Sequence, residues 1–283
     1  MRSVGQTFAC VGAKDPRLDD LGKTDFRLAR QLKAYTKGDP PLTRVHPMPL
    51  VLLSCLVEFF STGSDKSQAI ADLAMIAFFF MLRPGEYCSG GSDVQKSPFR
   101  IKDVQFGIDQ RDIPAIKITK SQHHKLTIVS LTFTDQKNGV KGGSITHGRT
   151  TDLKVDPVQC VLNRIMYLHQ HGAPATIALC SYLHKNVWTE LTASDITEAM
   201  RVTVRAHGKQ FGLLDSDISA RSMRAGGAMA LLLAGVPEDT IKLLGRWKSN
   251  AVLAYLHISA KELTKGYSQK MFSGGNYTLV PHS

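Results

Sequence analysis

Two arginines, 141 positions apart, lie in motifs that suit the binding of a phosphate group. Arg83 belongs to the run Leu-Arg-Pro-Gly-Glu at residues 82–86, and Arg224 to the run Ser-Met-Arg-Ala-Gly-Gly at residues 222–227. A guanidinium can donate two parallel hydrogen bonds to phosphate oxygens, which a lysine cannot do. Fixed cations of this kind stabilise the charge that builds on a phosphodiester during cleavage. The pair therefore indicates phosphate chemistry.

The residues around Arg83 predict how it is held. Proline disfavours helical backbone at the residue before it, so a helix that approaches Pro84 must stop at Arg83. Glu86 follows three residues after Arg83 and is close enough to orient its guanidinium. We therefore expect Arg83 at a rigid corner.

A tyrosine further along the chain could supply a nucleophile. Tyr255 lies 31 residues after Arg224 and follows the run Leu-Gly-Arg-Trp at residues 244–247. A phenol with a free pKa near ~10 needs help to ionise. If Arg221, Arg224 and Arg246 gather around Tyr255, they favour its phenolate form by through-space attraction.

Together these motifs resemble the tyrosine recombinase (phage integrase-like) family over residues 49–255. The resemblance implies an enzyme of DNA recombination and integration, in which the tyrosine attacks phosphorus and leaves a 3′-phosphotyrosyl link and a free 5′-hydroxyl. It implies that Arg83 and Arg224 hold the scissile phosphate and that Tyr255 is the nucleophile. No metal or other cofactor is required, and the implied partners are double-stranded DNA and further copies of the chain in a tetramer.

Two other positions of the implied site differ from the family pattern. Where the family has a histidine three residues before the second arginine, this chain has Arg221, which can bind phosphate but cannot accept a proton. The histidine or tryptophan position is Trp247 when counted from Arg224, and Arg246 when counted back from Tyr255. We prefer Trp247, because its indole N–H can donate to a phosphate oxygen.

The family's general acid is a lysine at the end of a strand, before a tight turn, and two positions fit. Lys120 follows the alternating run 116–119, and the polar residues 121–125 can turn the chain back into an apolar strand at 126–134. Lys137, before an Asn-Gly turn signal, is the alternative. We predict a hairpin with Lys120 at the end of its first strand.

Helical periodicity dominates the rest of the chain and predicts a mainly helical α+β fold, with two helical blocks flanking a small antiparallel sheet. The resemblance identifies this fold as an integrase-like catalytic domain. Gly226 and Gly227 cost ~1 kcal/mol each against alanine inside a helix, a cost that is tolerated where another backbone comes close. The predicted helices are 25–35 capped by Thr24, 49–60, 65–83 capped by Ser64 or Asp65, 157–171, 193–207, 221–235, 237–244 and 251–257.

Composition divides the chain into three parts. Residues 1–43 are a polar N-terminal segment and linker, which could be what remains of the DNA-clamping domain that the family carries. Residues 44–260 are the expected catalytic domain. Residues 261–283 have little periodic apolar content, so we expect a tail that is loosely held or donated to a neighbouring subunit.

The overall composition agrees with a nucleic-acid partner. The chain has 35 Lys and Arg against 24 Asp and Glu, and a basic surface attracts polyanions. Its five cysteines are widely spaced without a CxxC pair, which predicts reduced thiols in an intracellular protein of nucleus or cytoplasm rather than a disulfide framework or zinc site. The longest apolar run, 73–82, is about half of the ~20 residues that a membrane helix needs.

Two other functions fit parts of the sequence. Residues 233–241 have the look of a helix-turn-helix regulator, but the apolar Ile241, Leu243 and Leu244 favour burial over contacts with bases. A protein derived from a mobile element that keeps the fold and binds DNA without cleaving it is the second alternative, because Arg221 stands in the histidine position.

Overall fold

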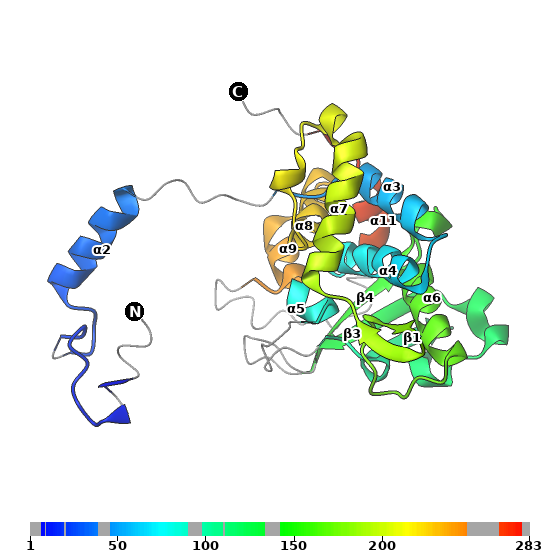
Figure 1. The fold of residues 1–283 in the computed structure, drawn as a ribbon, viewed down its shortest axis with the longest axis horizontal. Coiled ribbons are helices and arrows are strands. Elements are labelled where there is room, and N and C mark those ends of the chain that lie inside the picture. Colours follow the sequence, from blue (N-terminus) through cyan, green and yellow to red (C-terminus); the bar gives the residue numbers. More distant parts are fainter. Residues whose placement is uncertain are drawn as a thin grey trace. The chain divides into compact units, whose positions relative to one another are not determined.

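The computed structural model describes residues 7–8, 10–19, 21–38, 46–89, 98–109, 111–133, 142–247 and 266–278. The chain divides into two compact units, residues 1–44 and 45–283. The fold is α+β and mainly helical, with a small antiparallel sheet, as predicted (Figure 1).

The first unit contains the helix α2 (Phe26–Gly38), close to its predicted position. Its cap is Asp25, whose Oδ1 accepts the backbone N–H of Arg27 at 2.9 Å. The predicted cap, Thr24, instead pairs with Leu18 in an isolated bridge. The cap prediction was wrong by one residue, since aspartate and threonine stand side by side and either type can accept the free N–H groups of a helix.

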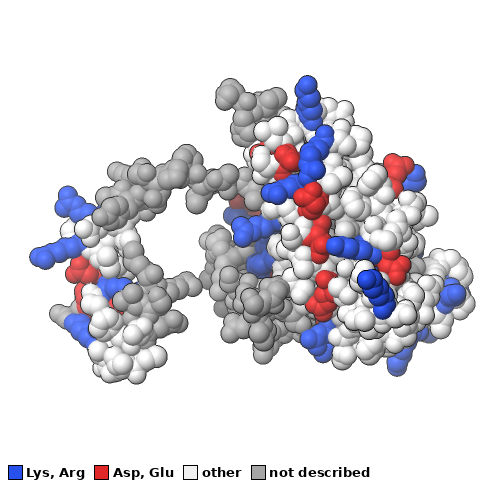
Figure 2. Space-filling model, in the orientation of Figure 1, with Lys and Arg blue, Asp and Glu red and all other residues white. Residues whose placement is uncertain are grey.

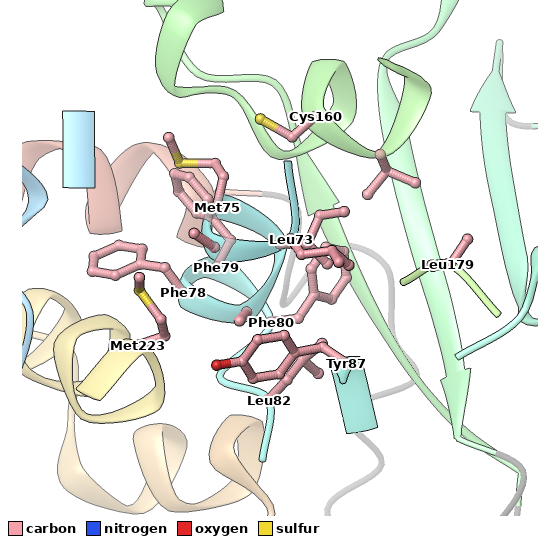
Figure 3. Packing of buried hydrophobic residues seen from close by; sticks show 14 of the residues in the cluster. Leu73, Met75, Phe78, Phe79, Phe80, Leu82, Tyr87, Cys160, Leu179 and Met223 are labelled. Atoms are coloured by element: carbon pink, nitrogen blue, oxygen red, sulfur yellow. The ribbon is translucent and has the colours of Figure 1, made fainter. Parts of the chain in front are cut away.

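Helix α4 (Asp65–Phe79) is the centre of the second unit. Ser64 caps it, as predicted, by accepting the backbone N–H of Ser67 at 3.3 Å. Figure 3 shows the apolar side chains of α4 packed together with Cys160 and Met223 from two other helices. The helices in contact with α4 are α3 (Leu50–Phe60), α6 (Pro157–Gln170), α7 (Ala193–His207) and α8 (Ser222–Leu233).

Helix α8 approaches its neighbours closely through two glycines. A Cβ on Gly226 would lie 2.3 Å from the carbonyl oxygen of Met48, and one on Gly227 would lie 2.2 Å from that of Phe78. The expected close approach of another backbone is confirmed. Because Phe78 belongs to α4, this contact brings α8 directly onto the end of α4, where Arg83 follows.

Four strands form one antiparallel sheet in the order β2-β1-β3-β4, and β5 and β6 form a separate two-stranded sheet. The β3–β4 register pairs Phe133 with Gly143 across the predicted Asn-Gly turn, which lies outside the described residues together with Lys137. Helix α6 packs on β3 and β4. The strands are β1 (Val104–Ile108), β2 (Arg111–Pro114), β3 (Ile128–Phe133), β4 (Gly143–Gly148), β5 (Ser181–His184) and β6 (Val187–Glu190).

The strand predicted at residues 116–119 is wrong. The strand paired with β1 is β2, which ends at Pro114. The chain then forms two short 3-10 helices, η2 (Ala115–Lys117) and η3 (Lys120–Lys125). Ala115 and Ile118 are both buried, and a spacing of three residues fits one turn of 3-10 helix. In so short a segment, the apolar spacing of a 3-10 turn resembles the alternation of a strand, and this is why a strand was predicted.

The end of the described chain packs onto its own fold. Helix α11 (Tyr267–Gly274) lies against α8. The hydroxyl of Ser268 donates to the carbonyl oxygen of Gly148 at 2.5 Å, and the N–H of Leu50 donates to that of Gly275 at 2.6 Å. Residues 266–278 are therefore packed on the fold, and the prediction that the tail is loosely held is wrong for this part of it.

Most predicted helices are confirmed to within two residues at each end. The exceptions are α2, which ends three residues later than predicted, the helix predicted at 65–83, which ends earlier, and the one predicted at 251–257, which lies outside the described residues. Ile241 and Leu244 of α9 (Glu238–Gly245) are buried, which confirms the expectation that this face is core.

Candidate functional site

The corner that carries Arg83 is built by a left-handed residue and a proline. Helix α4 ends at Phe79, and Met81 has φ +46°. Arg83 is extended, with φ −76° and ψ 150°, and Pro84 begins the short helix α5 (Pro84–Tyr87). Pro84 therefore keeps Arg83 out of a helix as predicted. The stop comes four residues earlier than predicted because the chain turns at Met81.

Glu86 orients Arg83, as the sequence suggested. One carboxylate oxygen accepts the backbone N–H of Arg83 at 2.7 Å and the other accepts its Nη1 at 2.8 Å. The Nη2 group of Arg83 donates to the backbone carbonyl oxygen of Arg246 at 3.1 Å. The side chain of Arg83 is 27% exposed, so a ligand in solvent can reach it.

Arg224 approaches the same corner from α8. Its Nη1 donates to the carbonyl oxygen of Met81 at 3.0 Å, and its Nη2 donates to that of Gly245. Its Cζ lies 4.3 Å from the ring centroid of Trp247. Arg83 and Arg224 are thus both bonded to residues 245–246, and the structure brings these two predicted site residues together.

A third guanidinium, that of Arg246, completes the group. Its Nη1 donates to the carbonyl oxygens of Phe80 and Leu244, each at 3.2 Å. Its Nη2 donates to the carbonyl oxygen of Met81 at 3.0 Å and to a carboxylate oxygen of Glu86 at 2.8 Å. We call Arg83, Arg224 and Arg246 the arginine cluster.

The arginine cluster carries more positive than negative charge. Burial, with further contributions from Arg246 and Arg83, lowers the pKa of Arg224 well below its ordinary value, to about 9. Burial also lowers the pKa of Arg246 to about 10, against the attraction of Glu86. Both of these guanidinium groups remain protonated at neutral pH. Glu86 alone does not balance them, so the cluster favours an added anion.

Arg83 and Arg224 keep hydrogen-bond donors for such an anion. A guanidinium has five N–H groups. Among the described residues, partners take two on Arg83 and two on Arg224. The three that remain on each side chain are enough for a bidentate contact with phosphate.

The other predicted site residues are less closely associated. Trp247 supports Arg224 through its ring and is 37% exposed. Arg221 is exposed at the start of α8, and Lys120 is exposed at the start of η3; between the described residues no bond joins either one to the arginine cluster. Tyr255, the expected nucleophile, lies outside the described residues.

Sequence reasoning underrated Arg246 and missed Met81. Arg246 was only the alternative to Trp247, yet it lies at the centre of the cluster. The sequence did contain a sign of its importance, because counting back from Tyr255 places Arg246 at the family's histidine or tryptophan position. Met81 contributes a backbone carbonyl, and an apolar side chain gives no sign of that in the sequence.

The charge on the face shown in Figure 2 is mixed. Lys and Arg side chains alternate there with Asp and Glu over the second unit, and they form no uniformly basic area. On α7, for example, Arg205 pairs with Glu198 at 2.6 Å and with Asp215 at 3.1 Å. Among the residues that are not drawn grey, the positive charge is therefore not gathered into one basic area on this face.

Neither the models of known protein families nor the curated protein sequences compared with this chain match it. In the part of the chain that the structure describes, no helix is both long and apolar enough to span a bilayer. The same residues contain no group of three or more His, Cys, Asp or Glu side chains placed to hold a metal ion.

Proposed function

We propose that this chain breaks and rejoins duplex DNA by the chemistry of tyrosine recombinases, with Arg83 and Arg224 holding the scissile phosphate. The observation that carries the proposal is the convergence of these two arginines, 141 positions apart, on one corner. Both retain N–H donors, and the excess positive charge around them matches a phosphodiester.

The steps of the proposed reaction assign a role to each residue. The phenol of Tyr255 loses its proton to solvent water and its oxygen attacks phosphorus, the bond to the 5′-oxygen breaks, and a 3′-phosphotyrosyl link forms. Lys120, or Lys137 as the alternative, protonates the departing oxygen, and attack by a 5′-hydroxyl reverses the step. Arg221 adds a cation three residues before Arg224. The proposed assembly is a homotetramer on DNA.

A second candidate function is DNA binding without cleavage. Arg221 occupies the position of the family's histidine, and it is exposed. A permanently charged guanidinium cannot accept the proton of an attacking phenol. A chain that had lost cleavage would keep the arginine cluster and its affinity for phosphate.

Incubation with a nicked suicide duplex tests the proposal. We expect the full chain to form an adduct that survives denaturing electrophoresis, and Tyr255→Phe to form none. Tyr182→Phe, in β5, is the matched tyrosine control and should behave as the parent does. Arg224→Gln should lower the rate of adduct formation by ~10²–10³. If the parent binds the duplex at low salt but forms no adduct, the second candidate is supported instead.

A further inference from the structure

Four helices of the described chain end in the same kind of turn, with one residue in left-handed backbone. In α6 and α8 that residue is glycine, Gly172 with φ +67° and Gly235 with φ +75°, the usual choice at this position. In α4 and α9 it is Met81, with φ +46°, and Arg246, with φ +57°. Residues other than glycine rarely adopt this backbone conformation.

These two exceptions meet each other. Each turn is closed by a pair of backbone hydrogen bonds. In the turn that ends α4, the N–H of Met81 donates to the carbonyl oxygen of Phe78, and the N–H of Leu82 donates to that of Ala77. The Nη2 of Arg246 then donates to the carbonyl oxygen of Met81, 165 positions away in sequence. Two strained turns in direct contact indicate a shared purpose, because strain persists only where surrounding contacts hold it.

The bonds of Arg246 differ from those of the other two arginines. Both of its terminal nitrogens donate twice, to three backbone carbonyl oxygens and to Glu86. Its side chain is 9% exposed, against 27% for Arg83, and its Cζ lies 4.0 Å from the ring centroid of Phe133. The terminal N–H groups of Arg246 are therefore all engaged by the protein.

The backbone beside this side chain holds the two outer arginines. The carbonyl oxygen of Arg246 accepts from Arg83, and that of Gly245 accepts from Arg224. Anchoring residues 245–246 to the end of α4 thus fixes both guanidinium groups at once.

We propose that Arg246 is a positioning residue, which clamps the end of α9 to residues 80–86 and so aligns Arg83 and Arg224 without contacting the phosphate. This inference rests on the proposed function for its role in cleavage. Whether Arg246 contacts the phosphate can be tested by measuring duplex binding, without any cleavage.

Salt dependence of duplex binding separates a clamp from a phosphate ligand. Each phosphate contact that is lost reduces the slope of log affinity against log salt by about 1. We expect Arg224→Gln to reduce the slope by about 1 and Arg246→Gln to leave it within experimental scatter of the parent. A slope that falls by about 1 in Arg246→Gln makes Arg246 a phosphate ligand and overturns the inference.

Cleavage at saturating duplex tests the positioning role. We expect Arg246→Gln to slow the single-turnover rate by ~10²-fold, in keeping with the cost of misplaced groups near a reacting centre, while its duplex affinity stays within about twofold of the parent. Arg246→Lys, which keeps the charge but not the four bonds, should recover only part of that rate. Full recovery by lysine shows that charge alone is needed and overturns the clamp.

A readout without cleavage separates this inference from the proposed function. The sequence has two tryptophans, so in a Trp188→Phe background the emission reports on Trp247. Arg246→Gln should shift this emission, because residues 245–247 lose their anchor, whereas Arg205→Lys on α7 should not. A shift with an unchanged salt slope supports the clamp even if the parent never cleaves DNA. An unshifted emission in Arg246→Gln overturns it.

Discussion

The guanidinium of Arg224 lies over the ring of Trp247, with Cζ 4.3 Å from the ring centroid. Gly245 makes room for this ring, since a Cβ there would lie 1.6 Å from one of its atoms. The ring therefore supports Arg224 from one side while its remaining N–H groups stay available. Such a contact contributes ~0.5–2 kcal/mol.

Trp247 should therefore report on anions that bind Arg224. In the Trp188→Phe background, titration with inorganic phosphate at constant ionic strength is expected to change the emission, because a bound anion alters the cation against the ring. The same titration in Arg224→Gln should be flat. A flat titration in the parent background would show that phosphate does not bind this cation.

Glu86→Gln should weaken the fold and increase its response to phosphate. The carboxylate accepts bonds from Arg83 and Arg246, and the amide cannot offset their charge. We expect a loss of about 1–3 kcal/mol in the free energy of unfolding. Thermal unfolding in phosphate and in chloride at equal ionic strength should show a larger gain in Tm for the variant. Equal gains would contradict an anion site beside Glu86.

His147 should make the fold sensitive to acid. Its ring lies 4.6 Å from that of Phe80, and burial lowers its pKa from 6.5 to about 3. Between these values the unfolded chain binds a proton that the folded chain does not, so stability falls as pH drops from about 6.5 to about 3, by up to ~1.4 kcal/mol per pH unit. Urea unfolding at pH 7 and pH 4.5 should show a smaller loss in His147→Leu than in the parent.

Gly227→Ala should destabilise the contact between α8 and α4. The added methyl would meet the carbonyl oxygen of Phe78 at 2.2 Å, and overpacking of this kind costs ~1–3 kcal/mol. Gly266→Ala is the matched control, because nothing lies within 4 Å of its added Cβ. Urea unfolding should place the control within ~0.5 kcal/mol of the parent. Similar losses in both variants would argue against the close approach.

Met271→Ala tests whether α11 belongs to its own chain. Met271 is fully buried, and truncation of such a side chain costs ~2–5 kcal/mol. The loss should be the same at every protein concentration if α11 packs within one chain. A midpoint that rises with concentration in the parent would favour exchange of the segment between subunits.

Helix ends were predictable from the sequence where one side chain fixes them. Ser64 caps α4 as expected, and Pro84 holds Arg83 extended. Such signals are local, because the capping group and the N–H that it accepts lie within three residues of each other.

The centre of the candidate site could not be predicted in the same way. Met81 and Arg246 have left-handed backbone, where local propensity favours glycine. The bond that joins them links residues 165 positions apart in sequence, so no local pattern indicates it. The short apolar spacing around Ile118 fits a strand and a 3-10 turn equally well, so Lys120 was placed in the wrong element.

A single carbonyl oxygen, that of Met81, receives one N–H from Arg224 and another from Arg246. The other acceptors of the two cations differ, being Gly245 for Arg224 and Phe80, Leu244 and Glu86 for Arg246. Rotation of the Met81 peptide plane would therefore loosen both guanidinium groups in the same movement and leave each one held by its remaining bonds.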